Sequence, residues 1–217
     1  MISPIETTDR RKLRKLLLSF AGGAVAGGLG AYSLLMFADS EMVGGLDPSR
    51  EIAAMVGLVY FVTALAVAIG VASPGFGARF LNVEDPDELR EQKMSLVLSS
   101  LAMAAIGLAL AVLAFSAPLG PIPAGIALGL AVILLVATVL LARRQRVYLD
   151  EFIQSVGRDA AAAAFYLVCL FGGGWAMIAH SGFLPAPAPL DWLSMLAGLL
   201  LVATLAACHQ KGLLQPR

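Results

Sequence analysis

Six apolar stretches without charged residues constrain the fold of this chain more than any other feature. Each is 17 to 23 residues long and contains no Asp, Glu, Lys or Arg. A bilayer core about 30 Å thick is crossed by about 20 apolar residues of helix. Lipid offers no hydrogen bonds to the backbone, so stretches of this length are expected to cross it as helices. The six predicted spans are residues 16–38, 52–72, 95–117, 122–142, 160–180 and 192–208.

The composition agrees with a chain that has lipid as its main solvent. It is 59% hydrophobic and 14% charged, whereas soluble domains are roughly 45–50% apolar and about 25% charged. The 15 basic and 15 acidic residues cancel, which argues against a nucleic-acid partner because such a partner requires a basic face. We therefore expect one all-α integral membrane domain over residues 1–217, with six transmembrane helices in three hairpins.

The basic residues predict the orientation of these helices. If both termini are cytoplasmic, every Lys and Arg except Arg50 lies on the cytoplasmic side, as the positive-inside rule requires. The larger loops, residues 73–94 and 143–159, then also lie in the cytoplasm. The Ala, Gly and Leu usage is typical of small membrane proteins of high-GC bacteria, so we expect a multi-pass protein of the bacterial inner membrane.

The loop over residues 73–94 contains the signals for a helix start. Asp85 fits the N-cap and Pro86 the first helical position, where each residue type is favoured. We expect a helix that begins near Pro86, carries an Asp87–Arg90 pair on its surface, and continues without a break into the span at residue 95. By the same reasoning, N-caps are predicted at Asp47 for the second span, Asp159 for the fifth and Asp191 for the sixth.

Two carboxylates of this loop, Glu84 and Glu91, are not explained by capping. A carboxylate site for a metal or a substrate is the alternative, but the segment lacks the alternating ligands and the glycine of a calcium loop. We therefore expect no metal, and we predict that Glu84 and Glu91 contact a partner.

The second loop, residues 143–159, has an amphipathic pattern. Tyr148 and Phe152 lie four residues apart on an apolar face, and Gly157 is placed to end the helix. One interpretation is an interfacial helix with its arginines toward anionic lipid headgroups. The alternative is that Tyr148 and Phe152 dock onto the first loop or onto a partner protein.

Glycines at four-residue spacing indicate close helix contacts. Gly23 and Gly27 have this spacing in the first span, where Gly30 also follows Ala26 by four residues. Gly125 and Gly129 repeat the spacing in the fourth span. Small residues let helix backbones approach within a membrane. The contact is either internal to the bundle or made with another subunit, and the pattern does not decide between them.

The spans lack the groups that most intramembrane chemistry requires. Ionisable residues at depth mark proton relays and catalytic sites, and here only His180 and His209 occur, at opposite ends of spans. Ala176 and His180 would let a flat haem or pigment ring lie on the helix, but an interfacial histidine is usually the polar end of a span. We expect no cofactor and no enzymatic activity.

The sequence resembles no characterised family. Its features favour a non-enzymatic accessory or scaffold subunit, which associates with another membrane protein or with its own copies. The alternative is a small oligomeric transporter or channel for neutral or hydrophobic solutes. Hydroxyl side chains within the spans would line its path.

Overall fold

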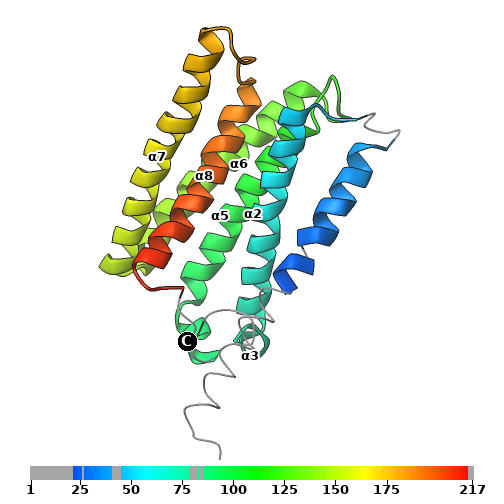
Figure 1. Cartoon of the computed structure of the whole chain (residues 1–217). Helices are drawn as coiled ribbons and strands as arrows, with labels where there is room; N and C mark the ends of the chain where they lie inside the picture. Colours follow the sequence, from blue (N-terminus) through cyan, green and yellow to red (C-terminus); the bar gives the residue numbers. More distant parts are fainter. Residues whose placement is uncertain (1–21, 26, 41–44, 79–82, 84–85, 215–217) are drawn as a thin grey trace, which may run out of the picture.

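The protein is all-helical in the computed structural model, which describes residues 22–25, 27–40, 45–78, 83 and 86–214. Of these described residues 82% are helical, and they form no strand. Five helices are long and apolar enough to cross a membrane, consistent with a multi-pass membrane protein (Figure 1). They are α2 (Pro48–Ala72), α5 (Lys93–Ala114), α6 (Ala124–Gln145), α7 (Glu151–His180) and α8 (Pro189–Gln210).

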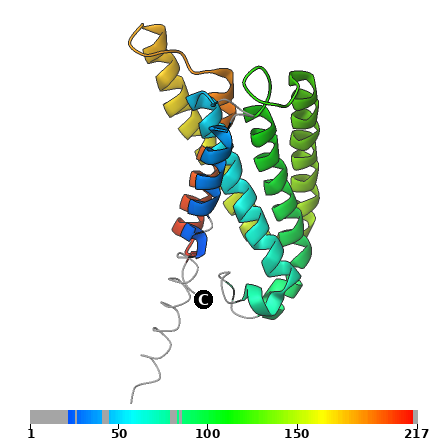
Figure 2. The same cartoon turned by 90° about the vertical axis from the view of Figure 1, so that its right-hand side faces the viewer.

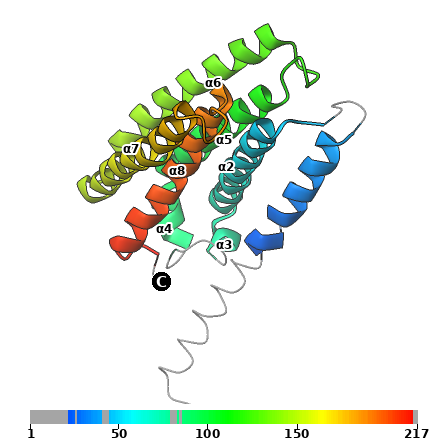
Figure 3. The same ribbon diagram turned by 45° about the horizontal axis from the view of Figure 1, so that its top comes forward.

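A shorter apolar helix, Gly22–Ala38, precedes these five. The first predicted span, residues 16–38, begins outside the described residues, so a sixth span remains a prediction. The helix lies at the edge of the bundle beside α2 (Figures 1 and 3). At its end, the Phe37 ring lies 5.3 Å from the ring of Phe115 in an edge-to-face arrangement.

The long helices form two groups that meet along α2 and α8. In the first group α5 lies between α2 and α6, and in the second α7 packs against α8. α6 and α7 are consecutive in the chain and meet where they are joined, but they diverge toward the other end (Figures 1 and 2). As a result, only 11% of the apolar stretch in each of α6 and α7 is buried, against 44% in α5.

Small side chains let α2 and α5 pack closely. Ala53 and Ala54 of α2 and Ala114 of α5 are at most 1% exposed and form one cluster. Farther along α2, the buried Tyr60 hydroxyl donates a 2.9 Å hydrogen bond to the Ala197 carbonyl of α8. This bond joins the two groups of helices at mid-depth, where a hydroxyl without a partner would be costly.

The start of α7 corrects the prediction for residues 143–159. A 3₁₀ turn, η1 (Arg146–Tyr148), follows α6, and α7 then runs unbroken for 30 residues from Glu151. Asp150 is its N-cap, accepting a 2.7 Å hydrogen bond from the Ile153 amide. The predicted end at Gly157 is wrong because one interior glycine costs a helix only about 1 kcal/mol.

The N-cap predicted at Asp159 is therefore also wrong. Asp159 lies inside α7, and its carboxylate is 3.2 Å from the ammonium of Lys211, which follows α8. The pair links the ends of the two helices of the second group.

The first loop confirms one expectation and corrects another. It contains α3 (Pro74–Gly77) and α4 (Pro86–Glu91), so a helix does begin at Pro86, although Asp85 lies outside the described residues. The helix does not continue unbroken, because a turn at Gln92 separates α4 from α5. We attribute this break to Leu89, which is 1% exposed and holds α4 against the bundle.

The remaining two capping predictions differ in outcome. Asp47 caps α2 as predicted, accepting a 3.1 Å hydrogen bond from the Arg50 amide. Asp191 is not the N-cap of α8, which begins at Pro189 because proline is favoured in the first turn. Asp191 is the third helical residue, and its carboxylate accepts a 2.6 Å hydrogen bond from the Ala188 amide.

Candidate functional site

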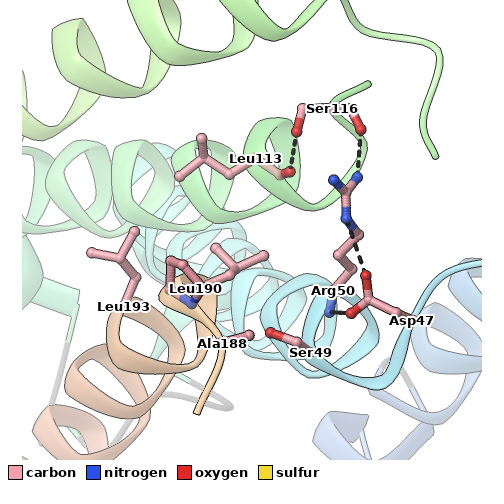
Figure 4. Close-up of a pocket in the computed structure, with 9 residues that line it drawn as sticks. Asp47, Ser49, Arg50, Leu113, Ser116, Ala188, Leu190 and Leu193 are labelled. Carbon is pink, nitrogen blue, oxygen red and sulfur yellow. Dashed lines mark hydrogen bonds and ion pairs between the residues drawn. The ribbon is translucent and has the colours of Figure 1, made fainter. Parts of the chain in front are cut away.

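Three helix ends surround a pocket of about 400 Å³ (Figure 4). α2 and α8 begin here and α5 ends here, so both polar loop residues and apolar helix residues contribute to the wall. The pocket is lined by Asp47, Ser49, Arg50, Leu113, Ser116, Ala188, Pro189, Leu190 and Leu193.

Arg50 is the only basic side chain among the described residues of the wall, and two of its three guanidinium nitrogens are engaged. Its Nη1 donates to the carbonyl of Ala114 at 3.1 Å and to the carbonyl of Ser116. Its Nε lies 3.3 Å from the carboxylate of Asp47, and only 16% of the side chain is exposed. Arg50 therefore fastens the start of α2 to the end of α5 and offers little to a ligand.

Ser49 carries the one buried side-chain polar atom of the described residues that lacks a hydrogen-bond partner, its Oγ. A serine nucleophile needs an adjacent base; among the described lining residues there is no His, Lys or Glu, and the one carboxylate, Asp47, pairs with Arg50. The described residues also contain no group of three His, Cys, Asp or Glu side chains that could hold a metal. The described lining residues thus join the ends of α2, α5 and α8.

The glycines predicted to make close contacts fall into two classes. A Cβ at Gly30 would lie 3.2 Å from Leu58 of α2, so this glycine serves internal packing. A Cβ at Gly23, Gly27, Gly125 or Gly129 would meet nothing within 4 Å. These four glycines meet no other described part of the chain, and their role in a partner interface stays a prediction.

The loop residues predicted to contact a partner are accessible where the structure describes them. Tyr148 and Phe152 are each 48% exposed, and Glu91 is also exposed. Glu84 lies outside the described residues. The structure does not bring Tyr148 and Phe152 together with Glu91 in a common pocket.

One close helix contact was not predicted from the sequence. Gly57 of α2 and Gly107 of α5 face each other so closely that a Cβ on Gly57 would lie 2.7 Å from the Gly107 carbonyl oxygen. A Cβ on Gly107 would lie 2.6 Å from the Gly57 oxygen. The signal was present, since Ala53 precedes Gly57 and Ala111 follows Gly107 at four-residue spacing.

A second such glycine lies between α7 and α8. Gly172 belongs to three consecutive glycines, through which α7 continues without a break. A Cβ on Gly172 would lie 2.6 Å from the Trp192 ring, so this glycine makes room for the tryptophan.

Comparison with known proteins adds no assignment: no family model, curated protein or solved structure matches this chain.

Proposed function

We propose that this protein is a non-enzymatic accessory or scaffold subunit of a membrane assembly, as its sequence also favours. The single observation that carries the proposal is the outward glycine pair of α6, Gly125 and Gly129. Its partner helix belongs to another membrane protein or to a second copy of this chain.

α6 carries small residues on two opposite faces. Ala127 and Ala131 are 1% and 2% exposed and form its inner face, and α5 is the helix against which α6 packs. Gly125 and Gly129 each precede one of these alanines by two residues, which is about 200° around a helix. The glycines therefore point away from the inner face, where a Cβ would meet nothing.

An outward pair of glycines has a cost that lipid contact alone does not offset. Glycine destabilises a helix by about 1 kcal/mol relative to alanine, and lipid chains pack equally well around larger side chains. A second helix benefits directly, because two glycines four residues apart let the backbones approach and make dense van der Waals contact. This supports a helix partner at α6.

The transport alternative receives little support from the hydroxyl groups of the described spans. Thr63, Ser100 and Thr204 donate to the carbonyls of Val59, Val97 and Leu200 in their own helices, at 2.7, 3.0 and 2.7 Å. Their donors are thereby engaged locally rather than presented to a solute. No specific observation favours this second function.

Replacing both outward glycines of α6 by leucine tests the proposal. We expect Gly125→Leu combined with Gly129→Leu to reduce the recovery of a co-purifying membrane protein, or of a second copy, at least tenfold. The leucines would keep a partner backbone at a distance without touching the chain's own core. The measurement is purification of the tagged protein in mild detergent, followed by quantitative mass spectrometry and light scattering.

The matched control is Gly173→Leu combined with Gly174→Leu on α7. These glycines also have nothing within 4 Å, so the control adds the same side chains to another exposed span. The control is expected to keep the wild-type complex. A monomer that purifies alone from the wild type, or equal recovery with the α6 variant, would refute the proposal.

A further inference from the structure

A crevice of about 300 Å³ lies between the end of α6 and the start of α7. Gln145 and Arg146 come from the α6 side, and Gln154 and Arg158 from α7. The remaining lining residues are Ala142, Leu149, Ile153, Gly157 and Ala161. The crevice therefore combines two cationic side chains and two amides with an apolar wall.

The charge within this crevice is positive and uncompensated. No acidic residue lines it, and neither arginine forms an ion pair with any described carboxylate. Of the nearby acids, Asp150 caps the Ile153 amide and Asp159 pairs with Lys211, and the exposed Glu151 is not part of the lining. Gln154 also holds the turn, donating to the carbonyls of Arg146 and Leu149 at 3.1 and 3.0 Å.

The apolar faces of α6 and α7 continue from the crevice into the predicted bilayer. Leu135 lies two turns before Ala142 on α6, and Phe165 lies one turn after Ala161 on α7, so they share the faces that line the crevice. They are 40% and 64% exposed. The two helices diverge from this point (Figures 1 and 2), which leaves these faces without a helix to cover them.

We propose that this crevice binds the headgroup of an anionic phospholipid, with its acyl chains along the diverging faces of α6 and α7. Arginine suits a phosphate because its planar guanidinium donates two parallel hydrogen bonds. Basic pockets between transmembrane helices are a common form of anionic lipid site. A soluble anion would use the arginines alone, whereas a lipid also covers the apolar faces beyond Ala142 and Ala161. The proposal rests on this crevice and is independent of the partner proposed for α6.

Native mass spectrometry of the full chain in detergent tests the site with dimyristoyl phosphatidylglycerol as the probe. We expect one tightly held lipid per chain and a clear preference over dimyristoyl phosphatidylcholine. Arg146→Gln combined with Arg158→Gln should weaken phosphatidylglycerol binding roughly 30-fold, from the usual contribution of two arginines near a membrane surface.

Two further variants separate the crevice from general surface charge. Arg143→Gln combined with Arg144→Gln removes the same charge from exposed residues outside the crevice and should weaken binding less than about threefold. Gly157→Leu keeps both arginines and fills the crevice, and should weaken binding about tenfold.

Four results would overturn the proposal. The first is equal binding of the two lipids by the wild type. The second is equal loss in the two arginine pairs, and the third is unchanged binding in Gly157→Leu. The fourth is full displacement of the lipid by millimolar inorganic phosphate, which would indicate a site for a free anion instead.

Discussion

Replacing Gly107 by leucine is expected to force α5 away from α2 and to lower the free energy of unfolding by about 3 kcal/mol. Even a Cβ at this position would lie 2.6 Å from the Gly57 oxygen and 3.1 Å from the Phe61 nitrogen. Both obstacles are backbone atoms of a helix, so no side chain can rotate to relieve the overlap. Gly107→Ala should show the same effect to a smaller degree.

Thermal unfolding in detergent, followed by tryptophan fluorescence, measures this loss. Gly173→Leu is the matched control, because it makes the same substitution where nothing lies within 4 Å. The control is expected to be neutral or slightly stabilising, since leucine favours a helix over glycine by up to about 1 kcal/mol. Similar unfolding temperatures for Gly107→Leu and the control would contradict the α2–α5 contact.

Arg50→Ala is expected to lower the free energy of unfolding by about 2 to 3 kcal/mol. The substitution removes the donor to the Ala114 and Ser116 carbonyls and leaves Asp47 without its ion-pair partner. Charge-assisted bonds at a mostly buried guanidinium are stronger than ordinary ones. The stability of Arg50→Lys should lie between those of the wild type and Arg50→Ala. An ammonium keeps the positive charge but cannot reproduce the planar set of guanidinium donors.

The same fluorescence measurement applies, with Arg90→Ala as the control. Arg90 also pairs with an aspartate three residues earlier, at 2.6 Å, but the two side chains are 67% and 72% exposed. Exposed pairs contribute at most about 1 kcal/mol. If Arg50→Ala and Arg90→Ala lowered the stability by the same small amount, Arg50 would not fasten α2 to α5.

The sequence predicts the long helices well wherever span length and capping residues agree. Four predicted spans correspond to α2, α5, α6 and α8, with ends displaced by a few residues. α7 is different because the nine residues before its predicted start form an amphipathic segment instead of an apolar one. Their pattern predicts a separate surface helix that ends at Gly157, whereas in the structure Asp150 provides the N-cap and one interior glycine does not stop the helix.

The neighbours of each helix are much harder to predict. In a soluble helix, one apolar face identifies the side that packs, but membrane spans are apolar on every side. The sequence therefore showed the spacing of Gly125 and Gly129 without showing whether it faced inward. It also contained the spacing around Gly57 and Gly107, but the pairing of two distant helices depends on the whole bundle.

The junction pocket was missed for a related reason. From the sequence, Arg50 was only the one basic residue outside the predicted cytoplasmic segments. Its bonds to Ala114 and Ser116 join residues more than 60 positions apart, which no local pattern encodes. For the crevice between α6 and α7, the sequence supplies the basic residues and the expectation that arginines of residues 143–159 face anionic headgroups, but not the pairing of Arg146 with Arg158 in one cavity.

The account depends most on α7 crossing the bilayer with its start, which follows η1 (Arg146–Tyr148), on the predicted cytoplasmic side. Cysteine accessibility tests this directly, in a chain in which the two native cysteines are replaced by Cys169→Ala and Cys208→Ala. Tyr148→Cys and Phe183→Cys then mark exposed positions just before and just after α7. The reagent is a maleimide that cannot cross membranes.

Phe183→Cys is predicted to react in intact cells, and Tyr148→Cys only after the membrane is opened. Labelling of both positions from the same side would contradict a membrane-spanning α7. Labelling of Tyr148→Cys alone in intact cells would show that the orientation is reversed.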